Sequence, residues 1–157
     1  MGIHRIVDRS DEAITSEAYT GNIRAFLGRI YESAFWVSKA RFEQVRQRLN
    51  DIALLAHGSL PYGAEEPNEV ARNVAHEVLS SLEAASLPPA SVIPLVDGGI
   101  EIVFVDDTNR AVIDIYNSGE IVAAAYQDQG EPTVWEIDDI ENQLQGTIAH
   151  IRVHLAA

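Results

Sequence analysis

The sequence of 157 residues contains no cysteine. This absence excludes a disulfide framework, thiol catalysis and zinc sites built on cysteine ligands. Long hydrophobic runs are also missing, since no apolar stretch approaches the roughly 20 residues that cross a bilayer. Residues 1–10 carry charges where a signal peptide needs an apolar centre. We therefore expect a folded protein with no membrane contact, located in the cytoplasm.

Positive charge is scarce, with 11 Lys and Arg against 24 Asp and Glu and a net charge of −13. Its distribution is uneven, because residues 1–50 hold eight basic and six acidic side chains, a net +2. Residues 51–157 hold only Arg72, Arg110 and Arg152 against eighteen acidic ones, a net −15. The larger part therefore disfavours nucleic acid and favours a protein partner with basic character.

The first 58 residues divide into two segments. Residues 1–15 lack periodicity, which predicts a flexible arm. Over residues 16–58 apolar side chains recur at helical spacing, up to the stop signals Gly58 and Pro61. This pattern predicts one helix of about forty residues, or a helical hairpin broken near Gly28 or Ser38.

Within this segment a short heptad tract indicates a packed helix face. Phe35, Phe42, Leu49 and Ala56 are spaced seven apart, with Val45 and Ile52 between them. Such spacing is typical of a helix pair or a dimer seam, and equally of a helix packed on its own domain. Both interpretations stay open at this point.

Residues 61–157 are predicted to form an α+β domain. An amphipathic helix is expected over residues 67–85, with Val70, Val74, Val78, Leu79 and Leu82 on its inner face. Period-two patterns then predict strands at 91–96, 100–105, 111–116, 120–126 and 133–137, and Asp138 is expected to cap a last helix ending at Leu155. The fold class is a four- to five-stranded antiparallel meander with flanking helices and a long N-terminal helix. We expect that helix to cover the second sheet face or to mediate dimerisation.

Turn chemistry predicts the strand register. Two-residue loops at Thr108-Asn109 and Ser118-Gly119 make Glu101 and Asp114 diagonal neighbours on one face. The other face then collects an apolar set: Ile100, Ile102, Phe104, Ile113, Ile115, Val122, Ala124 and Tyr126. Ile121, Ala123 and Ala125 fall on the face of Glu101, which is too apolar to be left entirely in water.

The chemistry-bearing residues form no recognised catalytic pattern. His150 and His154 are spaced for a shared metal, but Ile151 stands where zinc-protease helices have Glu. Histidines at the surface or at a helix end explain them more simply. Glu101 and Asp114 with Tyr116 could serve a small enzyme or ligand-binding domain, which is one alternative. The sequence predicts no catalytic, cofactor or metal site, and leaves enzymatic activity uncertain.

The residues expected at a partner interface form two groups. One lies on the N-terminal helix, where aromatic and basic side chains interleave: Trp36, Arg41, Phe42, Arg46 and Arg48. The other lies on the second sheet face: Glu101, Val103, Asp114 and Tyr116. The basic helix could instead contact nucleic acid, an alternative that the acidic remainder makes less favourable.

Three short motifs carry a resemblance over residues 61–122. These are the Tyr62-Gly63-Ala64 turn, the Leu87-Pro88-Pro89 link after a helix, and the Asp97-Gly98-Gly99 hairpin. The segment resembles a group of small uncharacterised bacterial proteins, some of them near toxin–antitoxin or phage-defence genes. With the charge distribution, this leads us to expect a non-enzymatic, acidic protein-interaction module of antitoxin, immunity or defence-accessory type. We expect it to bind a protein partner and to self-associate, most simply as a dimer.

Overall fold

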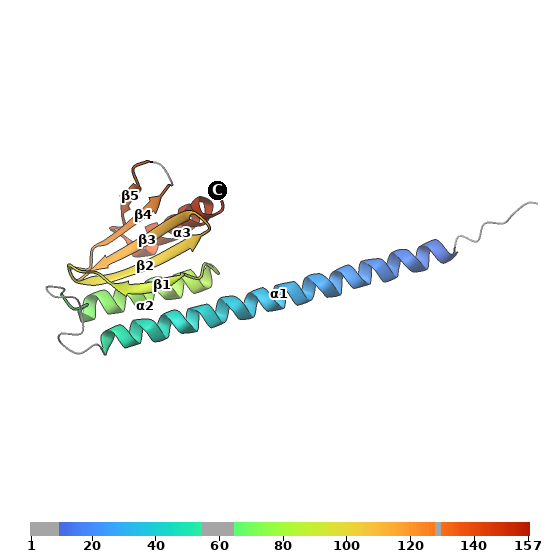
Figure 1. Ribbon diagram of the computed structural model, residues 1–157, viewed down its shortest axis with the longest axis horizontal. Helices are drawn as coiled ribbons and strands as arrows, with labels where there is room; N and C mark the ends of the chain where they lie inside the picture. The colour runs from blue at the N-terminus through green and yellow to red at the C-terminus, as the bar shows by residue number, and fades with distance from the viewer. Residues whose placement is uncertain (1–9, 55–64, 128–129) are drawn as a thin grey trace, which may run out of the picture. The chain divides into compact units, whose positions relative to one another are not determined.

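The computed structural model describes residues 10–54, 65–127 and 130–157, and the side chains from Arg24 onward within them. It has an α+β fold of three helices and a five-stranded antiparallel sheet, labelled in Figure 1. The elements are α1 (Ser10–Ala53), α2 (Glu69–Ala84), β1 (Ser91–Pro94), β2 (Gly99–Asp106), β3 (Asn109–Tyr116), β4 (Ile121–Tyr126), β5 (Thr133–Glu136) and α3 (Ile140–Leu155). The predicted fold class and strand positions are thus confirmed.

The sheet is a meander in which each strand pairs with its neighbours in the chain, in the order β1-β2-β3-β4-β5. The β2–β3 turn is Asp107-Thr108, because Asp106 pairs with Asn109. Asp107 takes a φ of 51°, a left-handed conformation that Asp tolerates better than most residues. The expected turn at Thr108-Asn109 was therefore wrong, and the β2–β3 register shifts by two residues.

The β3–β4 turn corrects the predicted faces of β4. Tyr116 N–H donates to Glu120 O, so the turn holds three residues and Gly119 closes it with a φ of 89°. Ile115 therefore pairs with Ile121, a slip of one residue from the expected register. A one-residue slip exchanges the faces of a strand. Ile121, Ala123 and Ala125 consequently belong to the core face, and Val122, Ala124 and Tyr126 to the opposite face.

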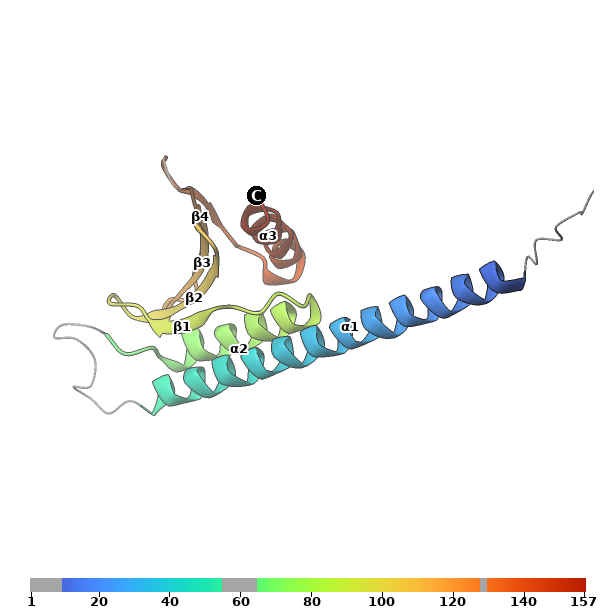
Figure 2. The same ribbon diagram turned by 45° about the vertical axis from the view of Figure 1, so that its right-hand side comes forward.

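One face of the sheet carries the main core, and the helices pack on it. Figure 2 shows α2 and α3 on the same side of the sheet. Their buried side chains join Ile100, Ile102 and Ile113 in one cluster, together with four residues near the end of α1: Phe42, Val45, Leu49 and Ile52. The long helix thus contributes to the same core as α2 and α3. The expectation that it covers the second sheet face was wrong.

Helix α1 is continuous through Gly28 and Ser38, so the helical hairpin is excluded. It begins at Ser10, and the predicted arm 1–15 therefore overlaps the helix from that residue onward. The chain divides into two compact units, Met1–Val37 and Ser38–Ala157, with the boundary inside α1. The predicted helix end at Gly58 lies outside the described residues.

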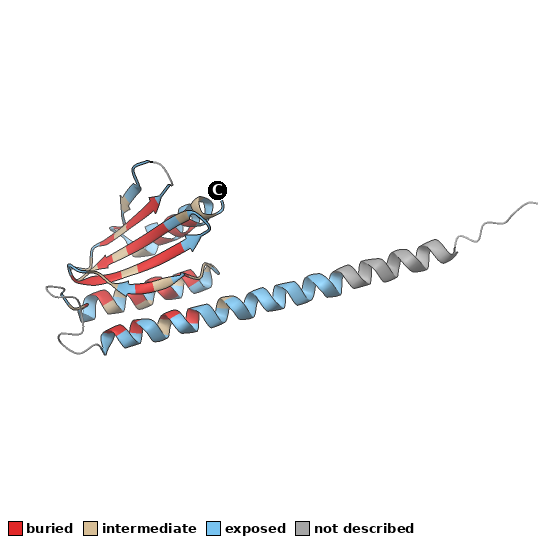
Figure 3. Cartoon of the chain, in the orientation of Figure 1, coloured by how far each residue is buried: buried red, intermediate tan, exposed pale blue. Residues whose placement is uncertain are grey.

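The heptad tract is split by this boundary. Phe42 is 2% exposed and belongs to the core, whereas Phe35, one heptad earlier, is 62% exposed. Figure 3 shows the change along α1 from exposed to buried positions. Packing on its own domain therefore explains the tract from Phe42 to Ile52, and Ala56 lies outside the described residues.

Helix α2 is held at its start by two asparagines. Asn68 caps it by accepting a hydrogen bond from Ala71 N–H at 3.0 Å. Asn117 in the β3–β4 turn accepts from Asn68 N–H at 2.8 Å and donates to Glu66 O at 2.9 Å. The inner face of α2 consists of Ala71, Ala75, Val78, Leu79 and Leu82. The expected Val70 is exposed instead.

Helix α3 is capped by Asp139 rather than by the expected Asp138, and Asp139 accepts from Asn142 N–H at 3.2 Å. At its other end the Nε2 of His154 lies 3.0 Å from Tyr126 O and 3.2 Å from Arg110 O. Both partners are acceptors, so Nε2 carries the proton and donates. This contact ties α3 to the ends of β3 and β4. No helix within the described ranges is long and apolar enough to span a membrane.

Candidate functional site

The second face of the sheet is a candidate interaction surface, here called the open sheet face. Register places the following side chains on it: Ile93, Glu101, Val103, Val105, Arg110, Val112, Asp114, Tyr116, Val122, Ala124, Tyr126, Val134 and Glu136. Val103, Val112 and Ala124 form a small cluster of their own, to which no described helix residue belongs. Around it Ile93, Val105, Tyr126 and Val134 remain exposed. This face is therefore an apolar surface with charged groups set into it.

Two carboxylates stand at the centre of this face. Glu101 on β2 and Asp114 on β3 are direct cross-strand partners, not diagonal neighbours as predicted. Directly opposed side chains have Cβ atoms about 5 Å apart, where like charges repel. Arg110, also on β3, donates to Glu101 Oε1 at 2.7 Å and compensates part of this repulsion. The Glu101 side chain is only 13% exposed, so the ion pair is partly shielded from water.

Asp114 has no comparable partner. Its Oδ1 is buried and lacks a hydrogen bond within the described part of the chain. Burial, together with the nearby charge of Glu101, raises the pKa of Asp114 from 3.8 to about 6, although Arg110 acts in the opposite direction. The open sheet face thus contains a buried carboxylate oxygen whose desolvation is not offset by a hydrogen bond from the described residues.

Tyrosines border the carboxylates on two sides. Burial and the neighbouring carboxylate of Asp114 raise the pKa of Tyr116, so its hydroxyl stays protonated and can donate a hydrogen bond. At the other end of β3 the Arg110 guanidinium carbon lies 5.3 Å from the centre of the Tyr126 ring. This cation–π contact holds the arginine over the sheet, beside Glu101.

The α1 residues that were predicted to form a partner interface have different environments in the structure. Phe42 is buried in the core and is not available to a partner, which corrects its expected interface role. Arg46 binds Glu83 of α2 at 2.5 Å, so it serves packing between the helices. Arg41 and Arg48 are exposed and line a groove of about 490 Å³ beside β1.

On the N-terminal side of Phe42, where α1 enters the core, the helix carries an exposed apolar stripe, here called the α1 stripe. Trp36 is 61% exposed, and its ring meets Phe35 edge-on, with centroids 5.6 Å apart. The α1 stripe itself consists of residues that helical spacing gathers on one side of the helix, away from Phe35 and Trp36: Phe26, Leu27, Ile30, Ala34 and Val37. All of them are exposed. An apolar helix face of this width normally has a partner.

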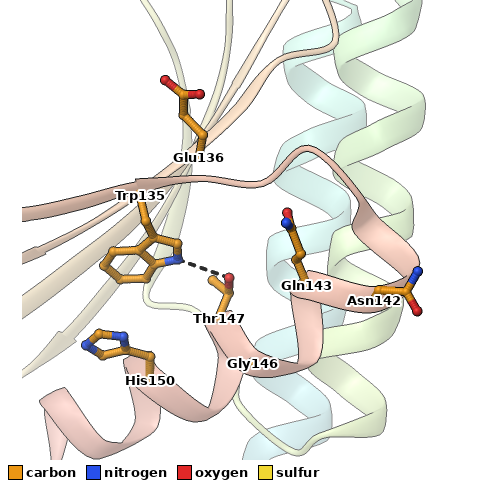
Figure 4. A pocket seen from close by; sticks show the side chains of 7 residues that line it. All are labelled: Trp135, Glu136, Asn142, Gln143, Gly146, Thr147 and His150. Carbon is orange, nitrogen blue, oxygen red and sulfur yellow. Dashed lines mark hydrogen bonds between the residues drawn. The ribbon is translucent and has the colours of Figure 1, made fainter.

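A further cavity of about 380 Å³ lies between β5 and α3. In Figure 4 the indole of Trp135 and the imidazole of His150 lie one over the other, with ring centroids 4.7 Å apart and planes 8° from parallel. Trp135 Nε1 donates to Thr147 Oγ1 at 3.0 Å, which fixes the indole. Gln143 points toward the cavity but already accepts from Asp138 N–H at 2.8 Å. His150 is thus part of an aromatic stack, while His154 binds backbone carbonyls of β3 and β4.

Sequence reasoning placed Val112 on the face of Asp114, where the structure has it, but overlooked Arg110 and Trp135. Arg110 has the same parity as Asp114 on β3, so the period-two pattern contained it. The partnership of Trp135 with His150 had no such signal, because the two residues belong to different elements. Within the described residues, no three His, Asp or Glu side chains gather closely enough to hold a metal ion.

The chain matches no family model, no curated protein and no solved structure. The resemblance of residues 61–122 to small bacterial proteins therefore remains a proposal.

Proposed function

We propose that the protein is a non-enzymatic protein-interaction module that binds a basic protein partner through the open sheet face. The observation that carries this proposal is the uncompensated carboxylate of Asp114 within an apolar face, since its buried Oδ1 has no hydrogen bond from the described residues. A lysine or arginine from a partner, placed over the face, would compensate the negative charge of the carboxylate pair. The exposed apolar side chains around it would supply contact area.

The charge distribution supports the same kind of partner. Residues 51–157 have a net charge of −15, which accelerates encounter with basic proteins and repels polyanions. An antitoxin, immunity or defence-accessory role is the specific form of this proposal, and the resemblance over residues 61–122 motivates it. Such a protein neutralises its partner by covering a basic functional surface.

Co-purification of the tagged full chain from its native cells tests the proposal. We expect a basic partner to be retained by the wild type and lost from a Glu101→Gln, Asp114→Asn double variant. Glu77→Gln is the matched control, because Glu77 is an exposed acid on α2, away from the sheet face. Absence of any partner, or equal retention by the double variant, would contradict the proposal.

We further propose that the chain self-associates through the α1 stripe, most simply as a dimer. Apolar residues at helical spacing on an exposed face favour pairing with a second helix. Phe26→Glu with Ile30→Glu should convert the assembly to a monomer in light scattering. Arg24→Glu is the control for added negative charge on the same helix. Truncation near residue 60 is unsuitable, because it removes Phe42 and the other α1 residues from the core.

A further inference from the structure

A second surface lies between α1 and β1, where a groove runs along an edge of the sheet. It is separate from the centre of the open sheet face, to which the proposed function assigns the basic partner. Its volume is about 490 Å³. One side is lined by α1, with Arg41, Gln44, Val45 and Arg48, and the other by residues 90–93 at the start of β1. The groove therefore follows an edge strand along its length.

Strand β1 presents backbone groups to this groove. Leu95 N–H donates to Gly99 O, and the register continues through Ile93 opposite Glu101. Because an antiparallel ladder uses alternate residues, the N–H and C=O of Val92 face away from β2. Such outward groups are the template on which an extended peptide adds as a further strand. Pro94 limits this pairing to a short segment, because proline has no N–H.

The side chains of the groove define the charge of its ligand. Arg41 and Arg48 are two helical turns apart on α1, with Gln44 between them, and all three are exposed. Neither arginine has an ion-pair partner among the described residues, whereas Arg46 on the same helix is paired with Glu83. Among the described residues that line the groove, none is acidic. Two unpaired guanidinium groups beside a strand edge favour carboxylates on an extended chain.

We propose that this groove binds an acidic peptide segment of a partner protein in extended conformation, by strand addition to β1. Alternate side chains of the added strand would point toward α1, and their carboxylates would meet Arg41 and Arg48. The outward groups of Val92 would bond to the peptide backbone. The groove is short, so the interaction is of the weak, transient class.

Fluorescence anisotropy with the full chain tests this proposal. The probe is a labelled, N-acetylated octapeptide of alternating glutamate and valine, used at low salt. We expect saturable binding that Arg41→Ala and Arg48→Ala each weaken about tenfold, as loss of a charge-assisted hydrogen bond does. Arg29→Ala should leave binding unchanged, because Arg29 lies on the same helix outside the groove. Circular dichroism checks that each variant is folded.

Two altered peptides separate strand addition from simple attraction of charge. Replacing glutamate by lysine should abolish binding, and N-methylation of alternate backbone nitrogens should weaken it at least tenfold. Slower exchange of the Val92 amide hydrogen in the complex would support the proposal further. Equal binding of the N-methylated peptide would overturn it, as would wild-type affinity in the double arginine variant. Tighter, arginine-dependent binding of a single-stranded oligonucleotide would also overturn it, by assigning the groove to nucleic acid.

Discussion

Glu101 and Asp114 face each other directly across β2 and β3, yet their carboxylates have different environments. Glu101 accepts a hydrogen bond from Arg110, while the Oδ1 of Asp114 is buried and has no described partner. The pair therefore retains uncompensated negative charge on a partly apolar surface. That imbalance gives the stability of the sheet a pH dependence, and it is the reason why we propose a cationic partner for the open sheet face.

Stability should fall as the pH rises through the titration of Asp114. Its pKa is about 6 in the folded chain, against an ordinary value of 3.8, so the folded state holds the proton more tightly between these values. Stabilisation by the proton is thus greatest below pH 3.8 and is lost by about pH 6. Allowing for its partial exposure, the change attributable to this residue is about 1–2 kcal/mol. Urea unfolding of the wild type and Asp114→Asn between pH 4 and 8 measures it, as the variant should lack this component.

Phe42→Ala should destabilise the domain by about 3–4 kcal/mol, since it removes a fully buried aromatic side chain from the core. Phe35→Ala is the matched control, one heptad earlier on the same helix and largely exposed, and should change the free energy of unfolding by less than about 0.5 kcal/mol. Urea unfolding of both variants checks this difference. Similar losses for both would mean that Phe35 is buried in a contact outside this chain.

Gly99→Ala should prevent normal folding or cost about 3 kcal/mol. Gly99 has a φ of 129°, and an added Cβ would overlap the carbonyl oxygen of Ile115 on the paired strand. Gly146→Ala is the control: it lies within α3, where an added Cβ meets nothing within 4 Å. Alanine there should raise stability by about 0.5–1 kcal/mol, through its higher helix propensity. Thermal unfolding distinguishes the two variants.

Thr147→Val should cost about 1–2 kcal/mol, because it leaves the Trp135 indole N–H without its acceptor inside a half-buried site. Thr147→Ser retains the hydroxyl and should restore most of this loss. Tryptophan fluorescence in a Trp36→Phe background reports on Trp135 alone. An unchanged Trp135 emission spectrum in Thr147→Val would show that the hydrogen bond does not position the ring.

Much of the sheet was predictable because period-two alternation depends on burial alone. Ile100, Ile102 and Ile113 were assigned to the core face correctly. The predicted β2–β3 register was wrong by two residues, and a shift of two residues leaves every side chain on the same face of the sheet. The predicted face of Ile121 was wrong because the length of the β3–β4 turn depends on the backbone conformation of a single residue, Gly119. Gly119 permits both two- and three-residue turns, and the sequence alone does not distinguish them.

The candidate surfaces depend on packing between distant segments, which local patterns do not contain. Arg41 and Phe42 are adjacent in the sequence, but one lines a groove and the other is buried in the core. Helix periodicity placed an apolar face on α1 without showing which residues would meet the sheet domain. Similarly, Glu101 and Asp114 were expected on one face, but their direct opposition followed only from the actual register.

The strand order has a consequence for how the chain folds. Every strand pairs with its sequence neighbour, so the sheet assembles through short-range loop closures, which are fast. Phe42 enters the same core as Val92, about fifty residues later in the chain. During synthesis, the end of α1 must therefore wait for the sheet to emerge before it can bury its apolar face. We expect its docking to be the late step of folding, and mutations at Phe42 to accelerate unfolding more than they slow folding.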